Sequence, residues 1–150
     1  MNKIYTLTND YLFKKIFREE KYLKKLLYDF FNIKANKIKY LNPELIKDYK
    51  KCKAGVVDLL LEVDNSVMIL ELQNLNRYNL KERMLYYESS ILCHECLKGA
   101  DDYNQLNSSK MLVIVNYGFL NKKILNKIKL TYENNIFSNL LEYKVLNLIN

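Results

Sequence analysis

The sequence is poor in the residues that mark several common kinds of protein. It has no Trp, 1 Pro, 3 Gly and 1 His among 150 residues. So few Gly and Pro exclude collagen-like and low-complexity chains, and no glycine-rich loop is present to cradle nucleotide phosphates. No apolar run reaches the roughly 18 residues of a membrane-spanning helix, and MNKIYTLTND lacks the apolar core of a signal peptide. We therefore expect neither membrane insertion nor secretion.

Cysteine is also scarce, and its 3 copies, Cys52, Cys93 and Cys96, lack the spacing of a disulfide framework. An odd number of cysteines suits a reducing compartment, so we expect a cytoplasmic protein. The segment CHEC holds a C-x-x-C pair around His94, but structural zinc needs four ligands and only Cys52 remains as a distant partner. We expect Cys93 or Cys96 to pack in the core instead. No nucleophile motif lies near His94, which disfavours Ser-His or Cys-His catalysis.

Charge is unevenly distributed along the chain, whose net charge is +7. Residues 1–53 carry 14 Lys and Arg against 6 Asp and Glu, residues 54–109 carry 4 against 9, and residues 110–150 carry 6 against 2. A basic shell around an acidic middle is typical of a phosphate-binding protein with a cation site. Basic proteins without nucleic-acid partners are common, so the charge alone does not decide the function.

Hydrophobic periodicity predicts helices at the front of the chain and strands in its middle and end. Thr8 or Asn9 can cap helical spacing that runs over residues 9–31, with a break near residues 18–21. Its lysines form either a solvated face or a DNA contact surface: Lys14, Lys15, Lys24 and Lys25. The other expected elements are a strand over residues 37–41, a hairpin over 55–73, a helix over Leu80–Leu97 stopped by Gly99, and strands over 111–117, 126–132 and 142–148. This order favours one α/β or α+β domain with helices on the faces of a sheet.

The stretch VVDLLLEVDNSVMILELQ, residues 56–73, has the pattern of two strands around the turn Asp64-Asn65. Both turn residues tolerate the left-handed backbone of a tight hairpin. With this loop Val63 faces Ser66, and Asp58 lies directly opposite Glu71. Because side chains alternate, one face of the hairpin is wholly apolar and faces the core. The mixed face holds Asp58, Leu60, Glu62, Val67, Ile69, Glu71 and Gln73.

Acids in the middle of these strands need an explanation. Like charges facing each other across a strand pair are unfavourable by roughly 0.2 to 1 kcal/mol. A cation would reverse the sign, and Mg²⁺ takes one or two carboxylates, keeps several waters and bridges to a substrate phosphate. Asp58 and Glu71, with Gln73 one same-face step beyond, therefore suit a hydrolytic site. The alternative is a half-exposed hairpin whose acids point to water and have no function.

A family resemblance comes from the order and spacing of several segments. They are TNDYLFKKIF, NPEL, VVDLLLEVDNSVMILELQ, ERMLYYESSI, and LKGADDY before the strand MLVIVNYGFL. Together they resemble the PD-(D/E)XK nuclease family transposases, or recombination-promoting nucleases, over most of residues 6–120. The resemblance implies a restriction-endonuclease-like fold, with a mixed central sheet flanked by helices, in one domain over residues 1–150. Further sequence usually follows this domain, so a short or truncated member is expected.

The same resemblance implies the residues of the site. Asp58 and Glu71 are implied as metal ligands, helped by the backbone carbonyl of Leu72, and Gln73 occupies the position usually held by Lys. A Gln can orient a water but cannot act as a cation. The implied accessory residues are Asp10, Arg83 and Tyr87. Arg83 could reach a phosphate as a planar fork or anchor its helix, and Asp10 could approach the metal or serve as a first-turn acid.

The function implied by the resemblance is a Mg²⁺-dependent DNA endonuclease associated with transposition or recombination, with Mn²⁺ as the alternative ion. Little sequence specificity is expected because no base-reading motif is present. The expected partner is DNA, with no membrane, and the chain is expected to form a homodimer or to pair with a homologous nuclease. Two alternatives stay open: a non-catalytic DNA- or partner-binding relative that regulates a full-length nuclease, and an enzyme of unrelated chemistry that reuses the hairpin.

Overall fold

The computed structural model describes residues 8–45, 55–94, 102–121 and 123–148. Its elements, in chain order, are α1 (Asp10–Phe17), α2 (Glu20–Phe31), β1 (Ile38–Tyr40), β2 (Glu44–Leu45), β3 (Gly55–Val56), β4 (Leu59–Val63), β5 (Ser66–Gln73), α3 (Leu80–His94), the 3₁₀ helix η1 (Tyr103–Gln105), β6 (Ser108–Val115), β7 (Leu125–Tyr132) and β8 (Asn135–Asn147).

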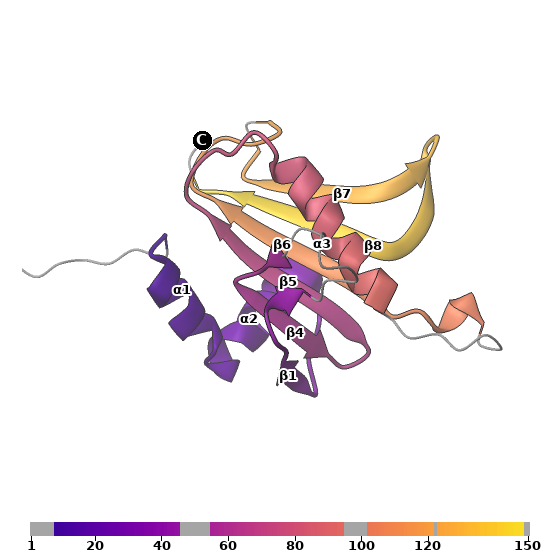
Figure 1. Ribbon diagram of the computed structural model, residues 1–150, viewed down its shortest axis with the longest axis horizontal. Coiled ribbons are helices and arrows are strands. Elements are labelled where there is room, and N and C mark those ends of the chain that lie inside the picture. Colours follow the sequence, from indigo (N-terminus) through magenta and orange to yellow (C-terminus); the bar gives the residue numbers. More distant parts are fainter. Residues whose placement is uncertain (1–7, 46–54, 95–101, 122, 149–150) are drawn as a thin grey trace, which may run out of the picture.

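A mixed sheet of six strands lies at the centre of the described structure (Figure 1), in the order β1-β4-β5-β6-β8-β7. Strands β5, β6 and β8 run parallel, whereas β1, β4 and β7 are antiparallel to their neighbours. The connection from β5 to β6 includes α3, since a crossover between parallel strands needs a long connection. Strands β2 and β3 form a separate two-stranded sheet. The predicted mixed sheet with flanking helices is confirmed.

Helices cover both faces of the sheet, so two hydrophobic cores share it. Helices α1 and α2 pack on one face, where the core includes Phe13, Leu27, Leu61, Leu70 and Leu112. Helix α3 packs on the other face, where the core includes Ile69, Leu80, Met84, Met111 and Val145. Neighbours in β5 belong to opposite cores because side chains alternate along a strand. This arrangement buries β5 from both sides.

Helices α1 and α2 are separated by the break that the sequence predicts. Asn9 caps α1, because its Oδ1 accepts a hydrogen bond from the backbone N–H of Leu12 at 3.1 Å. The first helix ends at Phe17 and the second begins at Glu20. Each helix turns an apolar face toward the sheet, which is why the same 3.6-residue spacing runs through both.

The register of the hairpin is also confirmed. Val63 pairs with Ser66, and Leu59 pairs with Leu70. Asp64 has φ 51°, the left-handed backbone that the turn requires. Its carboxylate accepts hydrogen bonds from the backbone N–H groups of Asn36 at 3.2 Å and Lys37 at 2.9 Å. The turn is thereby tied to the segment that leads into β1.

The first strand of the predicted hairpin is wrong in one respect, because it is not continuous. Pairing with β5 begins at Leu59 and does not extend back to Asp58. Strand β3, which precedes Asp58, pairs with β2 instead. The backbone N–H of Val57 donates to the carbonyl of Pro43 at 3.0 Å, and the Val57 side chain is buried. Asp58 therefore lies at the bend between two strands rather than inside a ladder.

The mixed face of the hairpin is largely buried at its Asp58 end. The alternative of a half-exposed hairpin whose acids point to water is therefore wrong for Glu71. Ile69 is fully buried and Glu71 is 3% exposed, because α3 covers this face. Glu62, near the turn, is partly exposed. The end of the face that carries Asp58 and Glu71 is thus an interior position.

The later strands confirm the predicted positions but differ in length. Strand β6 begins at Ser108 and ends at Val115, and β8 begins at Asn135, which extends its hairpin with β7. Cys93, predicted as one of two candidates for core packing, is exposed. Cys52, Cys96, Leu97 and Gly99 lie outside the described residues. Among the described helices, none combines the length and apolar character needed to cross a membrane.

Candidate active site

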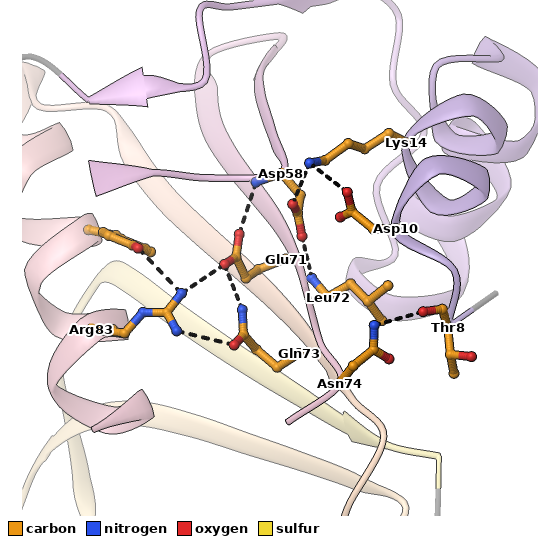
Figure 2. Close-up of polar contacts among 10 residues, drawn as sticks. Thr8, Asp10, Lys14, Asp58, Glu71, Leu72, Gln73, Asn74 and Arg83 are labelled. Atoms are coloured by element: carbon orange, nitrogen blue, oxygen red, sulfur yellow. Dashed lines mark hydrogen bonds and ion pairs between the residues drawn. The ribbon is translucent and has the colours of Figure 1, made fainter. Parts of the chain in front are cut away.

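Asp58 and Glu71 meet where β4 begins and β5 approaches its end (Figure 2). The backbone N–H of Asp58 donates to Glu71 Oε2 at 2.9 Å. In return, the backbone N–H of Leu72 donates to Asp58 Oδ2 at 2.8 Å. Each acid therefore accepts a hydrogen bond from the backbone of the other strand. This reciprocal pair fixes both carboxylates at the bend.

The bend at Asp58 explains how an acid can occupy this position. Because the ladder between β4 and β5 begins at Leu59, the N–H of Leu72 has no strand partner across from it on that side. The carboxylate of Asp58 takes the place of a backbone carbonyl as its acceptor. A buried N–H without an acceptor would cost roughly 1 to 3 kcal/mol. Asp58 thus accepts the hydrogen bond of an otherwise unpaired backbone N–H and also adds a negative charge at the strand end.

Glu71 is the more deeply buried of the two acids, with its side chain 4% exposed. Burial, and after it the nearby charge of Asp58, raises the pKa of Glu71 from 4.5 to about 7. The Asp58 backbone N–H, Arg83 and Lys14 act in the opposite direction. A site that holds two acids this close favours a bound cation, because a cation stabilises both charged forms.

Arg83 of α3 connects the buried acid to Gln73 and Tyr87. Its Nη2 donates to Glu71 Oε1 at 3.1 Å and to the hydroxyl of Tyr87 at 3.4 Å, while its Nη1 donates to Gln73 Oε1 at 3.1 Å. The guanidinium also lies 5.5 Å from the centre of the Tyr87 ring. Gln73 Nε2 completes the network by donating to Glu71 Oε1 at 2.8 Å. Four predicted residues thus form one hydrogen-bonded group.

Lys14 of α1 approaches the site from the face of the sheet opposite to Arg83 (Figure 2). The sequence did not predict Lys14 as a site residue. Its Nζ lies 2.9 Å from Asp58 Oδ1 and 3.2 Å from Asp10 Oδ2. Burial lowers the pKa of Lys14, but its contacts with Asp58 and Asp10 outweigh that effect and raise it. Asp10 is both a first-turn acid and a partner of this lysine. A signal was available, since Lys14 follows Asp10 by one helical turn within TNDYLFKKIF.

Asn74 is a second residue that the sequence analysis missed. Its Nδ2 donates to the backbone carbonyl of Thr8 at 2.7 Å, which ties the chain after β5 to the start of α1. Next to it lies a groove of about 270 Å³ lined by Leu72, Gln73, Asn74, Leu75, Arg77 and Arg83. The groove is open and mostly polar, and it begins beside the buried network.

The donor set suits a hard divalent cation. Within the described residues, no group of three or more His, Cys, Asp or Glu side chains gathers as a metal cage. Mg²⁺ does not need such a cage, because it commonly takes one or two carboxylates and completes its shell with waters and a substrate phosphate. Asp58 and Glu71 supply two carboxylates, and hard cations prefer oxygen ligands. The residues present therefore fit such an ion.

Comparison with known families agrees with this arrangement. A sequence model described as the PD-(D/E)XK nuclease family transposase matches residues 7–150. The chain belongs to this family. The mixed sheet with helices on both faces is accordingly the restriction-endonuclease-like fold of a PD-(D/E)XK nuclease family transposase. PD-(D/E)XK nucleases generally use divalent metals and act on DNA. No curated protein and no solved structure matches the sequence significantly.

Proposed function

We propose that this chain is a DNA endonuclease that hydrolyses phosphodiester bonds at Asp58 and Glu71 with Mg²⁺, or with Mn²⁺ in its place. The observation that carries the proposal is the reciprocal pair of hydrogen bonds at 2.9 and 2.8 Å between the two strands. These bonds hold two carboxyl groups together beside Lys14 and Arg83, in a largely buried place where a bound divalent cation would stabilise the charged form of both acids. Membership of a nuclease family supports phosphodiester hydrolysis as the reaction class.

Asp58 and Glu71 would hold the ion, with the backbone carbonyl of Leu72 as a third ligand. The bound ion would lower the pKa of a water and polarise a phosphate oxygen. Glu71 Oε1 already accepts hydrogen bonds from Gln73 and Arg83, so its orientation is fixed before any ligand arrives. Prior orientation of this kind reduces the reorganisation needed during the reaction.

Gln73 is proposed to position both Glu71 and the attacking water. An amide nitrogen carries two N–H groups, and Gln73 donates one of them to Glu71 Oε1. The second N–H is the group proposed to orient water toward the phosphorus. Its carbonyl oxygen accepts from Arg83, which prevents the amide from turning over. Gln73 therefore acts as an orienting group, while positive charge comes from neighbouring side chains.

We expect a phosphate of the DNA strand to enter the polar groove beside Gln73. Arg77 also lines this groove, and its guanidinium can bind phosphate oxygens with two parallel hydrogen bonds. The basic segments at both ends of the sequence would add salt-sensitive affinity for the backbone of DNA. Contacts to phosphates carry no direct sequence information, so we propose little sequence specificity.

Plasmid cleavage with matched variants tests this function. Supercoiled plasmid is incubated with the protein and Mg²⁺ or Mn²⁺, with EDTA as the metal-free reference. We expect nicked or linear product with either ion, and a loss of about 100-fold or more in Asp58→Asn and in Glu71→Gln. Glu62→Gln is the control, because it makes the same change on a partly exposed acid of the same hairpin.

The outcomes separate the proposal from its alternatives. Cleavage that survives in both Asp58→Asn and Glu71→Gln would remove the assignment of these residues. DNA binding without cleavage by the wild-type protein would instead support a non-catalytic relative. Circular dichroism of each variant shows whether a lost activity reflects a lost fold.

A further inference from the structure

Lys14 contacts Oδ1 of Asp58, a carboxylate oxygen that we expect to bind the metal ion. Its Nζ lies 2.9 Å from Asp58 Oδ1, the carboxylate oxygen that does not accept from the backbone of Leu72. The Asp58 side chain is 14% exposed, and the Lys14 side chain is 36% exposed. The ammonium thus compensates Asp58 from the solvent side. A divalent cation cannot share that oxygen with an ammonium at hydrogen-bonding distance without strong repulsion.

We propose that Lys14 is a resident cation that the metal displaces from Asp58, and that the released ammonium then binds the phosphate under attack. This inference rests on the proposed function and adds a catalytic residue to it. Before the metal binds, the ammonium stabilises the acid pair. After the metal binds, the ammonium supplies positive charge beside the reacting phosphate.

The second partner of Lys14 makes this displacement feasible. Asp10 Oδ2 lies 3.2 Å from Lys14 Nζ, one helical turn earlier on α1, and its side chain is 61% exposed. When Asp58 turns to the metal, Lys14 therefore keeps one carboxylate partner on its own helix. The flexible four-carbon stem of lysine allows its ammonium to move while the helix stays in place.

The backbone around Lys14 is well anchored, so the movement is confined to its side chain. Phe13 and Phe17 are 1% and 8% exposed in the core beneath α1. Asn74 holds the backbone of Thr8 at 2.7 Å, just before the helix. These contacts fix the distance between α1 and the end of β5. The ammonium is consequently kept within reach of Asp58 and of any phosphate bound there.

Arg83 cannot take this part, although it is the other cation of the site. Its guanidinium donates to Glu71, Gln73 and Tyr87 at 3.1, 3.1 and 3.4 Å. Its side chain is 19% exposed and stays in a planar fork around buried acceptors. Arg83 therefore holds Glu71 in position, whereas Lys14 has both the exposure and the freedom to follow a substrate.

The variant Lys14→Met tests the inference, because we expect its metal affinity to rise and its cleavage rate to fall. Mn²⁺ affinity is measured by calorimetry without DNA, and plasmid cleavage is measured at saturating Mn²⁺. We expect Mn²⁺ to bind Lys14→Met about 3- to 30-fold more tightly, because a competing cation has been removed. We expect cleavage to fall about 30-fold or more, because the phosphate loses its ammonium. Lys15→Met is the control, since Lys15 is the exposed neighbour on the same helix.

Asp10→Asn gives a second reading that does not depend on removing the lysine. Without Asp10, the ammonium depends on Asp58 alone, so we expect Mn²⁺ to bind several-fold more weakly. Unchanged or weaker Mn²⁺ binding by Lys14→Met would overturn the displacement. Cleavage by Lys14→Met at the wild-type rate would overturn the contact with phosphate.

Failure of the proposed function gives a different pattern of results. In that case the wild-type protein would neither bind Mn²⁺ nor cut DNA, or Asp58→Asn would have no effect on either. If Asp58→Asn abolishes both while Lys14→Met matches Lys15→Met in both, only the inference about Lys14 fails. Thermal unfolding of every variant confirms that the compared proteins are folded.

Discussion

Asp58 donates its backbone N–H to the carboxylate of Glu71 at 2.9 Å, so one candidate ligand holds the other in place. The carboxylate of Asp58 in turn accepts from the backbone of Leu72 at 2.8 Å. The two acids therefore serve the architecture and the proposed chemistry together. A substitution at either position is expected to affect the strand bend as well as cation binding, which is why amide replacements are the informative ones.

Replacement of Arg83 should destabilise the protein through Glu71. Arg83→Met would leave a carboxylate that is 4% exposed without its guanidinium partner, and we expect a loss of about 1 to 3 kcal/mol in the free energy of unfolding. The stability of Arg83→Lys should lie between that of the wild type and that of Arg83→Met, because one ammonium cannot reproduce a planar fork on Glu71 and Gln73. Denaturant unfolding provides the measurement. Arg77→Met serves as the exposed control, and equal stability of the Arg77 and Arg83 variants would contradict the prediction.

Gly55 is predicted to be intolerant of a side chain because of its position next to the site. A Cβ there would lie 2.8 Å from Leu45 Cδ1 and 2.9 Å from Tyr87 Cε1. Since the Tyr87 ring also contacts Arg83, Gly55→Ala should cost about 1 to 3 kcal/mol and lower cleavage as well. Melting temperature and plasmid nicking test both effects.

Gly118→Ala is the matched control for that substitution. Apart from its chain neighbours, no residue in the described part of the chain lies within 4 Å of a Cβ built at Gly118, so the same change should leave stability and cleavage close to wild type. If the two variants behaved alike, the close packing around Gly55 would have no measurable consequence for the site.

Asp64 should matter for the hairpin through both its backbone and its carboxylate. Its φ of 51° disfavours most residues, and its carboxylate accepts from the backbone of Lys37 at 2.9 Å. We expect Asp64→Ala to lower the free energy of unfolding by about 1 to 2 kcal/mol. Asp64→Asn should lose much less, because Asn tolerates the left-handed backbone and keeps an acceptor oxygen. Equal losses in the two variants, measured by denaturant unfolding, would argue against this account.

Glu88 should make stability depend on pH. Its side chain is fully buried and neither carboxylate oxygen has a hydrogen-bond partner among the described residues. Burial raises the pKa of Glu88 from 4.5 to about 7, against the smaller opposing effects of Ser109 and Lys110. The folded protein therefore keeps a proton that the unfolded chain releases between these pH values. The contribution of Glu88 to the free energy of unfolding should be fully present below pH 4.5 and should be lost as the pH rises through about 7.

Glu88→Gln should remove the part of this pH dependence that comes from Glu88, whereas Glu71, whose pKa is also raised to about 7, keeps its own part. At about pH 8 the variant should exceed wild type by on the order of 1 to 3 kcal/mol, and the difference should nearly vanish at about pH 5. Denaturant unfolding at several pH values gives the comparison, with Glu82→Gln as an exposed control on the same helix. The account fails if the wild-type protein and Glu88→Gln lose stability with the same slope between these values.

Much of the fold followed from local signals in the sequence. The turn at Asp64 set the hairpin register, and alternation along β5 separated its two faces. The break between α1 and α2 was visible in the spacing of apolar residues. The hairpin pattern predicts Asp58, Glu71 and Gln73 as site residues, and the family resemblance adds Arg83 and Tyr87. The structure brings these side chains into one region.

Other features depend on contacts between distant segments, which no local pattern encodes. The bend before Asp58 arises because Val57 bonds to Pro43, and the burial of Glu71 arises because β5 lies between β4 and β6 under α3. The sequence shows the spacing of Lys14 from Asp10 but not its approach to Asp58. Only the packing of α1 against the sheet places its ammonium next to Asp58.

The two ends of the sheet bear on how the protein avoids forming fibres. One outermost strand, β1, is only three residues long, and the other, β7, carries the exposed Lys127 and Lys129. Unpaired strand edges invite other chains to add on, and short edges or lysines on an edge discourage this. A second chain laid against β7 would bring lysines of both copies close together. The sheet is therefore protected at both margins against edge-to-edge aggregation.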